Sequence, residues 1–114
     1  MSNSSYPILE EKFIDQLDRI IEEHMTSEQF CVDDLSGLLY LSNSQVYRKI
    51  RQQTGVSPSN YILQKRLEKA VDLIENTKTP ITQIAYELGF NTASYFSTCF
   101  SDFFGYPPSD LRRK

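Results

Sequence analysis

The chain has 114 residues, a length that suits one domain with an ordinary hydrophobic core. Apolar residues make up 39% and charged residues 24%, which excludes a disordered chain, and no apolar run approaches the roughly 18 residues of a membrane span. The net charge of −3 argues at first against nucleic acid, while two cysteines and one histidine exclude a disulfide scaffold and disfavour a zinc site. We expect no metal and no cofactor. Since the N-terminus lacks a secretory signal pattern, we expect a cytoplasmic location.

Apolar periodicity predicts three helices in the first half of the chain. Residues 1–9 are polar and are predicted to be a linker or a cloning remnant. Apolar residues at helical spacing predict a helix over 10–25 and a shorter helix over 32–41. A serine cap predicts a third helix over 42–53, which Gly55 closes.

Proline and glycine mark the helix boundaries of the second half. The pair Ser57-Pro58 is a helix start signal and predicts a long helix over 58–76. The pair Thr79-Pro80 repeats this signal, and three shorter helical segments follow, over 80–89, 92–104 (closed by Gly105) and 109–112. No segment has a strand pattern, so the predicted fold is all-α, with about seven helices and short joints.

The chain contains an internal repeat. Residues 35–42 parallel residues 84–91 at an offset of 49, and beyond the turn the offset becomes 50, where Val46 matches Phe96 and Ile50 matches Phe100. Each copy reads as a short helix, a tight turn and a second helix, which is the helix-turn-helix pattern. We call the second helix of each copy a recognition helix.

The two turns differ at one position. The length of the helix between the two copies can be compared with the spacing of major grooves on a duplex. Gly89 can adopt positive φ at little cost, whereas Tyr40 at the matching position cannot, so the first turn is either built differently or mildly strained. The helix over 58–76 would span about 28 Å, and major grooves on one face of a duplex lie about 34 Å apart. Two recognition helices on such a rod could enter neighbouring grooves. A compact six-helix bundle is the alternative.

Charge is distributed unevenly along the chain. Residues 1–42 hold two basic and nine acidic side chains, a charge of −7, whereas residues 43–114 hold ten basic and six acidic side chains, a charge of +4. A polyanion responds to the local field within a Debye length of about 8–10 Å, so a basic surface can exist on an acidic protein. An unevenly charged solvated surface is the alternative interpretation.

Several stretches resemble the AraC/XylS family of bacterial transcription regulators. The most specific runs from Ile81 to Asn91 and continues through Ser94-Tyr95-Phe96-Ser97, and the segment from Ser42 to Lys49 is also similar. The chain further resembles output domains of hybrid two-component sensors. The resemblance implies a homeodomain-like fold over residues 10–114, in which helix-turn-helix units at about 32–53 and 80–104 are bridged by the helix over 58–76.

The resemblance also implies a function and partners. It implies sequence-specific binding of double-stranded promoter DNA through both recognition helices, as the output domain of a transcription regulator, by expectation an activator. RNA polymerase is a further candidate partner. A separate sensory portion outside this segment, which could carry histidine kinase activity, is expected to control the domain and to support dimerisation.

On the first recognition helix, Val46 and Ile50 are predicted to face the core, which leaves the polar side chains outward. Family position implies Ser44 and Arg48 as base readers, since arginine can bind guanine O6 and N7 together, and Gln45 can address adenine. Lys49 and Arg51 suit phosphates, with ordinary solvated charges as the alternative. The candidate DNA-binding residues here are Ser42, Asn43, Ser44, Gln45, Tyr47, Arg48, Lys49 and Arg51.

The second recognition helix contains no lysine or arginine. Thr98 occupies the position that matches Arg48, where relatives often carry a basic residue, and Ser101-Asp102 stands where a basic pair is frequent. This helix could contact DNA weakly, read thymine methyl groups and shape, or touch the backbone alone. Its candidate DNA-binding residues are Asn91, Thr92, Ala93, Ser94, Ser97 and Thr98.

Some remaining residues are expected to be structural. We expect Arg66 to form an ion pair with a neighbouring helix and Cys31 and Cys99 to be buried thiols. A basic tail that faces phosphate or solvent is expected to consist of Arg112, Arg113 and Lys114. An enzyme is disfavoured, because the chain has no glycine-rich phosphate loop and no nucleophile paired with a base. The rival function is a helical protein-interaction module with a weakened DNA-binding surface.

Overall fold

The computed structural model describes residues 12–112, and within this range the protein consists of helices alone, as predicted. The elements in chain order are α1 (Phe13–His24), α2 (Val32–Leu39), α3 (Asn43–Thr54), α4 (Pro58–Asn76), α5 (Ile81–Glu87), α6 (Ala93–Phe104) and the 3₁₀ helix η2 (Pro108–Arg112). The predicted linker at 1–9 and the first residues of the predicted helix over 10–25 lie outside the described residues.

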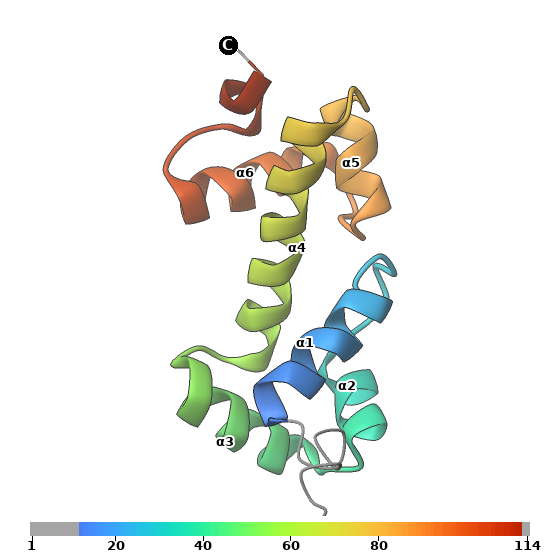
Figure 1. Cartoon of the computed structure of the whole chain (residues 1–114), viewed down its shortest axis with the longest axis vertical. Helices are drawn as coiled ribbons and strands as arrows, with labels where there is room; N and C mark the ends of the chain where they lie inside the picture. Colours follow the sequence, from blue (N-terminus) through green and yellow to red (C-terminus); the bar gives the residue numbers. More distant parts are fainter. Residues whose placement is uncertain (1–11, 113–114) are drawn as a thin grey trace, which may run out of the picture.

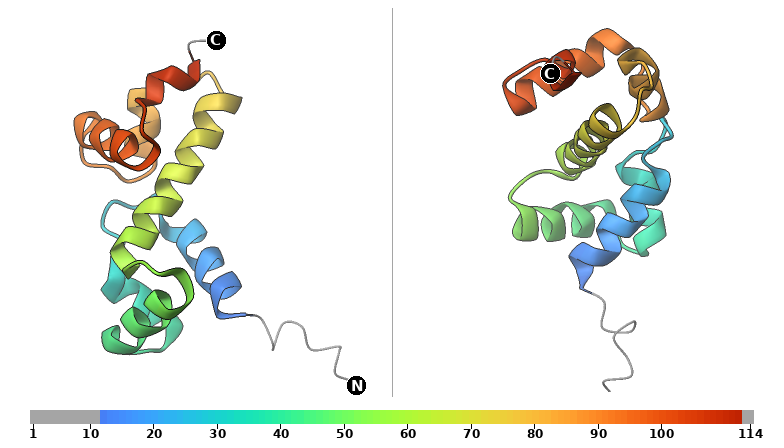
Figure 2. Two further views of the ribbon diagram at one scale, coloured as in Figure 1. Left: turned by 90° about the vertical axis from the view of Figure 1, so that its left-hand side faces the viewer. Right: turned by 45° about the horizontal axis from the view of Figure 1, so that its top comes forward.

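The helices are arranged around α4, which crosses an elongated molecule of 52 × 30 × 23 Å (Figure 1). At one end, α1, α2 and α3 pack on the first half of α4, and we call this the first unit. At the other end, α5, α6 and η2 pack on the second half, and we call this the second unit. The two views of Figure 2 place α3 and α6 on the same side of α4.

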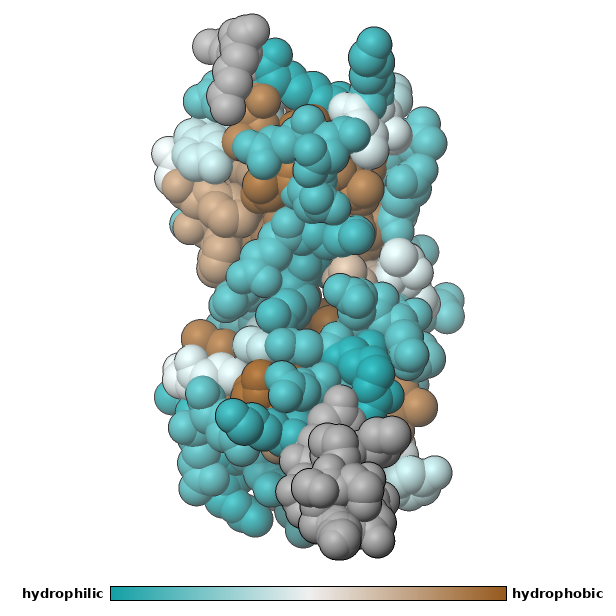
Figure 3. All heavy atoms as spheres, in the orientation of Figure 1, coloured by the Kyte–Doolittle hydropathy of each residue, from teal (hydrophilic) through white to brown (hydrophobic). Residues whose placement is uncertain are grey.

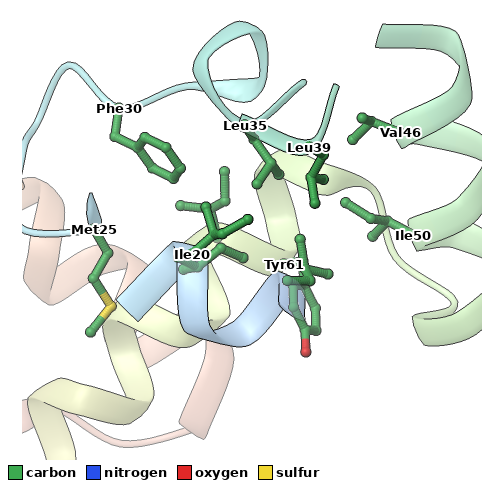
Figure 4. Packing of buried hydrophobic residues seen from close by; sticks show 11 residues of the cluster. Ile20, Met25, Phe30, Leu35, Leu39, Val46, Ile50 and Tyr61 are labelled. Atoms are coloured by element: carbon green, nitrogen blue, oxygen red, sulfur yellow. The ribbon is translucent and has the colours of Figure 1, made fainter. Parts of the chain in front are cut away.

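Each unit has its own hydrophobic core, and α4 contributes to both. Tyr61 and Ile62 join the first core, which Figure 4 shows between α1, α2 and α3, and its remaining members are Leu17, Ile20, Ile21, Met25, Phe30, Leu35, Leu39, Val46 and Ile50. One to three turns later, Leu67, Ala70 and Ile74 join the second core, with Ile84, Ala85, Leu88, Phe90, Phe96 and Phe100. The helix therefore connects the two units, and each unit packs on it through apolar side chains.

A partly buried hydrogen bond also joins the first unit to α4. The Tyr61 hydroxyl donates to Asp18 Oδ1 on α1 at 2.6 Å, and Lys65 Nζ lies 3.5 Å from the other oxygen of the same carboxylate. Burial, followed by the bond to the Asp18 carboxylate, raises the pKa of Tyr61 above its ordinary value. The proton that this bond needs is therefore held tightly.

Most predicted helix ends are confirmed by the caps that the structure shows. Ser42 Oγ accepts from the Gln45 N–H at 3.2 Å while Gln45 Oε1 accepts from the Ser42 N–H at 2.9 Å, which completes a capping box at α3. Ser57 Oγ caps α4 by accepting from the Asn60 N–H. Gly105 ends α6 with φ of 86°.

The predicted start signal at Thr79-Pro80 is wrong in its details. Pro80 is itself the N-cap of α5, which begins at Ile81, and no side chain caps this end. The Thr79 carbonyl instead accepts a hydrogen bond from Arg112 Nη1. The prediction failed because a distant arginine, not the local hydroxyl, satisfies the backbone at this joint.

Of the two alternatives predicted for the turn of the first unit, the structure shows the strained one. As a result, α2 ends at Leu39 and not at the predicted Leu41. Tyr40 adopts a left-handed backbone (φ 57°, ψ 39°), and Gly89 in the second unit also has a positive φ, of 91°. A left-handed conformation costs a residue other than glycine about 1–2 kcal/mol. The repeat therefore extends to the backbone conformation of its turns, although only one copy carries glycine.

The repeat also continues further along the chain than the sequence patterns alone indicated. Gly55 and Gly105, at the offset of 50, both close a recognition helix in left-handed conformation. Three residues later, Pro58 and Pro108 are both buried and begin the next helix. Each unit thus ends in the same device, a glycine followed by a proline that starts a new helix.

The predicted ion pair of Arg66 is wrong, and so is the predicted place of Arg112 in a basic tail, while Arg113 and Lys114 of that predicted tail lie outside the described residues. Arg66 donates to two backbone oxygens of the α1–α2 loop, from Nε to Met25 at 2.8 Å and from Nη2 to Ser27 at 2.7 Å. Arg112 donates from Nε to Ile74 O at 3.0 Å and from Nη2 to Thr77 O at 2.8 Å, besides the bond to Thr79. Both side chains satisfy carbonyls that no helix hydrogen bond reaches.

The expected burial of both cysteines is also wrong. Cys31 is exposed as the N-cap of α2, where its backbone N–H donates to Asp34 Oδ2 at 3.1 Å. Cys99 is partly buried on α6, and both thiols are free. Cys31 precedes the helix predicted to begin at residue 32, and at this N-cap position its side chain faces solvent and not the core. None of the helices in the described range is long and apolar enough to cross a membrane.

Candidate nucleic-acid interface

The exposed face of α3 carries the predicted polar and cationic side chains. Val46 and Ile50 are fully buried in the first core, as predicted, and this orientation turns the opposite face of the helix to solvent. Lys49 is half-buried, and the other candidates are exposed, namely Ser42, Asn43, Ser44, Gln45, Tyr47, Arg48 and Arg51. The structure therefore presents one continuous polar surface from the N-cap to the last turn of α3.

Arg48 lies at the centre of this surface with its guanidinium uncommitted. Within residues 12–112, no hydrogen bond or ion pair engages it, whereas its neighbours have intramolecular contacts. Lys49 Nζ lies 5.1 Å from the centre of the Phe13 ring, and the Arg51 guanidinium lies 5.9 Å from that of Tyr47. Arg48 is thus the cation of α3 that is most available to an external partner.

Gln52 belongs to the same surface and was not predicted as a site residue. It is exposed and lies four residues after Arg48, which itself lies four residues after Ser44, so the three side chains form one stripe along α3. The i+4 spacing in the sequence could have identified it. An amide at this position can donate to and accept from a base edge.

The second recognition helix, α6, presents hydroxyl groups in the corresponding positions. Phe96 and Phe100 are fully buried, while Asn91, Thr92, Ser94, Ser97 and Thr98 are exposed and Ala93 is half-buried against the second core. Thr92 Oγ1 caps the helix by accepting from the Tyr95 N–H at 3.0 Å. The equivalent of the Ser44, Arg48 and Gln52 stripe is Ser94, Thr98 and Asp102.

The two recognition helices therefore match in geometry and differ in charge. The sequence of α3 contains three cations and no acidic residue, whereas α6 contains Asp102 and no cation. The surface around α6 is also more apolar, as Figure 3 shows in the upper part of the molecule, and Phe103 and Tyr95 are among its exposed residues. Contact with Cys99 is the main cause that raises the pKa of Tyr95.

Residues 12–112 contain no group of three or more side chains suited to holding a metal ion. The exposed polar side chains lie on the outer faces of α3 and α6, and these two helices lie on one side of the molecule (Figure 2). A convex helix face with a central arginine can enter the major groove of a duplex, which is about 12 Å wide. This arrangement suits recognition of an extended polyanion.

Comparisons with known proteins agree with this geometry. The profile of a family described as "Helix-turn-helix domain" matches residues 35–114. The chain is 34% identical over 93% of its length to Histidine kinase P4 of Formosa agariphila, and 34% identical over 88% of its length to the HTH-type transcriptional activator RhaS of Citrobacter koseri. It spans only 8% and 36% of these two proteins.

A solved structure has the same fold at similar identity. It is the C-terminal domain of the two-component response regulator yesN from Fusobacterium nucleatum, which is 33% identical and superposes with a TM-score of 0.78. The match covers 87% of this chain and 96% of that one. The likeness therefore includes both units and the helix between them.

Proposed function

The chain belongs to the AraC/XylS family of DNA-binding helix-turn-helix domains of transcription regulators, and from this premise we propose that it binds duplex DNA unequally, with α3 as the principal reader of sequence and α6 as a secondary contact. The domain is of a DNA-binding and not of a catalytic type. The observation that carries the proposal is the uncommitted Arg48 at the centre of the exposed face of α3.

In this proposal α3 lies in a major groove. Arg48 binds guanine O6 and N7 as a bidentate donor, which discriminates against a wrong base by about 1–3 kcal/mol. Ser44 and Gln52 reach flanking base edges, and Gln45 offers its Nε2 while its Oε1 stays in the capping box. Lys49 and Arg51 neutralise phosphates at the groove walls. Release of counterions from those phosphates supplies much of the affinity.

The second recognition helix enters the neighbouring groove with weaker contacts. The 19 residues of α4 span about 28 Å, which is near the separation of successive major grooves on one duplex face. Ser94, Ser97 and Thr98 offer hydroxyl groups and one methyl group to base edges, and Asn91 can donate to a phosphate. Asp102 repels the nearest phosphates, so α6 contributes less binding free energy than α3.

We further propose that the domain, over residues 10–114, is the output end of a longer cytoplasmic regulator. The relatives that the chain matches include a histidine kinase and a transcriptional activator, and the chain spans a small part of each. A sensory portion that could carry kinase activity would control the domain and could bring two copies together. RNA polymerase is the proposed protein partner of the activator.

The experiment is a selection of binding sites followed by a salt titration. The 114-residue chain is used to enrich a random-sequence library of 30-base-pair duplexes, and the dissociation constant for the enriched duplex is measured by fluorescence anisotropy between 50 and 300 mM KCl. If Lys49 and Arg51 each neutralise one phosphate, the logarithm of affinity falls with the logarithm of salt at a slope of about −1.8 or steeper. A selection that enriches no sequence contradicts the proposal.

A helical protein-interaction module is the second candidate function. The observation in its favour is the second unit, where Tyr86, Tyr95 and Phe103 are exposed and residues 81–104 contain two acidic side chains and no basic one. In that case the affinity for duplex DNA would be weak and independent of sequence. The same titration distinguishes the two functions.

A further inference from the structure

The two units approach each other away from α4 at the α1–α2 loop. The α1–α2 loop of the first unit extends toward the turn between α5 and α6 in the second unit, as Figure 1 shows, and Arg66 on α4 binds it there. The residue stands between Ile62, which belongs to the first core, and Leu67, which belongs to the second. It therefore lies at the place where α4 passes from one unit to the other.

The loop that Arg66 binds is firmly held by the first unit. Met25 and Phe30, at its two ends, are buried in the first core. Inside the loop, the Ser27 N–H donates to His24 O at 3.1 Å and the Phe30 N–H donates to Ser27 O at 3.2 Å. Because the loop is fixed to the first unit in this way, hydrogen bonds from Arg66 to the loop hold the whole unit in place relative to α4.

The second unit reaches the same loop through Gly89. A Cβ placed on Gly89 would lie 3.0 Å from Met25 O, 3.2 Å from Glu28 N and 3.2 Å from Arg66 Nη2. Met25 O thus accepts from Arg66 and also lies against the turn of the second unit. The equivalent turn residue in the first unit, Tyr40, is 93% exposed, so the close approach is a feature of this junction and not of helix-turn-helix turns in general.

Arg66 is partly withdrawn from water at this junction. Desolvation lowers the pKa of its guanidinium from the ordinary value, although the group remains charged at neutral pH. A charged donor that gives up hydration for two carbonyls forms stronger hydrogen bonds than a neutral one. The planar guanidinium can bridge both oxygens at once, which a lysine ammonium cannot do in the same geometry.

We propose that Arg66 and Gly89 are positioning residues that fix the mutual angle of the two units, so that α3 and α6 fit two half-sites at one spacing on the duplex. The proposal rests on the function proposed above. Inserting one base pair between half-sites rotates the second by about 35° and moves it by about 3.4 Å. A rigid pair of recognition helices cannot follow this change, and the gain from binding both half-sites together is then lost.

The test compares two variants that each remove one positive charge from α4. Arg66→Met removes the donors to the loop, whereas Lys69→Met, the matched control, removes a side chain whose ion pair is with Asp72 on the same helix. Both are titrated against the duplex selected by the wild-type chain, against copies with one base pair inserted or deleted, and against a duplex with only the half-site of α3.

The wild-type chain and Lys69→Met are expected to bind the altered spacings at least about tenfold more weakly than the selected one. Arg66→Met is expected to reduce this ratio to threefold or less while it binds the single half-site as Lys69→Met does. If Arg66→Met keeps the tenfold ratio, the proposal is overturned. Arg66→Lys, which keeps the charge without the bidentate geometry, replaces Arg66→Met if circular dichroism shows that the latter does not fold.

A second arm needs no DNA. Backbone ¹⁵N relaxation gives the rotational correlation time of each unit, and the two units of the wild-type chain are expected to tumble as one body. In Arg66→Met the correlation times are expected to separate, and identical times in that variant would overturn the proposal. A wild-type chain that selects no duplex but shows this separation in the variant would contradict the proposed function alone.

Discussion

Tyr40 and Gly89 occupy equivalent turns with the same left-handed backbone, and their surroundings are opposite. Gly89 is buried against the α1–α2 loop, so both its conformation and the lack of a side chain are required. Tyr40 is solvated and meets only the conformational requirement, which it satisfies under strain. At the scale of single residues, a residue other than glycine is therefore tolerated in a left-handed turn where its side chain is exposed and does not clash with a neighbouring segment.

Replacing Tyr40 with glycine is expected to stabilise the fold. The substitution removes a strain of about 1–2 kcal/mol and adds backbone entropy to the unfolded chain, so the free energy of unfolding should rise by about 0.5–1 kcal/mol. Urea denaturation followed by circular dichroism measures this change. A lower free energy of unfolding in Tyr40→Gly would show that the exposed ring makes a stabilising contact.

The equivalence of Arg48 and Thr98 permits a reciprocal exchange. Arg48→Thr should weaken binding to the selected duplex by about 1–3 kcal/mol, because the bidentate contact to guanine is lost. Thr98→Arg should strengthen binding, because it adds a cation to a helix that has none. Anisotropy titrations of both variants measure the two shifts. An unchanged affinity in Thr98→Arg would place α6 away from the duplex.

At the scale of elements, the left-handed glycines Gly89 and Gly105 provide a matched pair. Their φ angles are 91° and 86°, but a Cβ on Gly105 would meet nothing within 4 Å. Gly105→Ala should therefore lower the free energy of unfolding by the conformational cost of about 1–2 kcal/mol. Gly89→Ala should lower it by a further 1–3 kcal/mol or so, because the methyl group crowds backbone atoms of the α1–α2 loop.

Thermal unfolding followed by circular dichroism distinguishes the two alanine variants. Equal losses in Gly89→Ala and Gly105→Ala would mean that the loop retreats from the new methyl group without cost. Such a result would also remove one of the two contacts that we assign to the junction of the units.

The end of α4 depends on an arginine from η2. Arg112 donates to Ile74, Thr77 and Thr79, so one guanidinium satisfies the carbonyls where α4 stops and α5 approaches. Arg112→Ala should lower the free energy of unfolding by about 1.5–3 kcal/mol, the range for hydrogen bonds to charged groups. Chemical denaturation measures this loss, and Lys78→Ala, which removes an exposed charge nearby, is the control with little expected effect.

Whether the sequence predicts one of these features depends on how far apart along the chain the interacting residues lie. The caps at Ser42 and Ser57 and the buried face of α3 involve residues within four positions, so local patterns predicted them correctly. Arg66 and Arg112 bind carbonyls 33 to 41 residues away, and carbonyls have no signature in a sequence. Gln52 is an intermediate case, since its spacing of four from Arg48 is a local pattern, while its exposure depends on how α3 packs on the first core.

At the scale of the whole molecule, a protein with a net negative charge can have a locally cationic helix, because its acidic and basic residues are distributed unevenly along the chain. The acidic residues of α1 and of the α2 start lie in the first part of the chain. The helix α3, whose sequence holds three cations, lies on the same side of α4 as α6 (Figure 2). Opposing charges more than a Debye length away are largely screened at physiological salt. Asp33 at the α2 start is the exception, since its Oδ1 accepts a hydrogen bond from Asn43 Nδ2 on α3 at 2.6 Å. The local surface and not the net charge of −3 therefore decides how the protein meets a polyanion.

The most direct test of the account is a hydroxyl-radical footprint of the 114-residue chain on its selected duplex. We predict two protected segments on one face of the duplex, about one helical turn apart, with the stronger protection at the half-site that loses it in Arg48→Ala. A single protected segment that Arg48→Ala leaves unchanged would contradict the account, because neither the shared side of α3 and α6 nor the exposed arginine would then take part in binding.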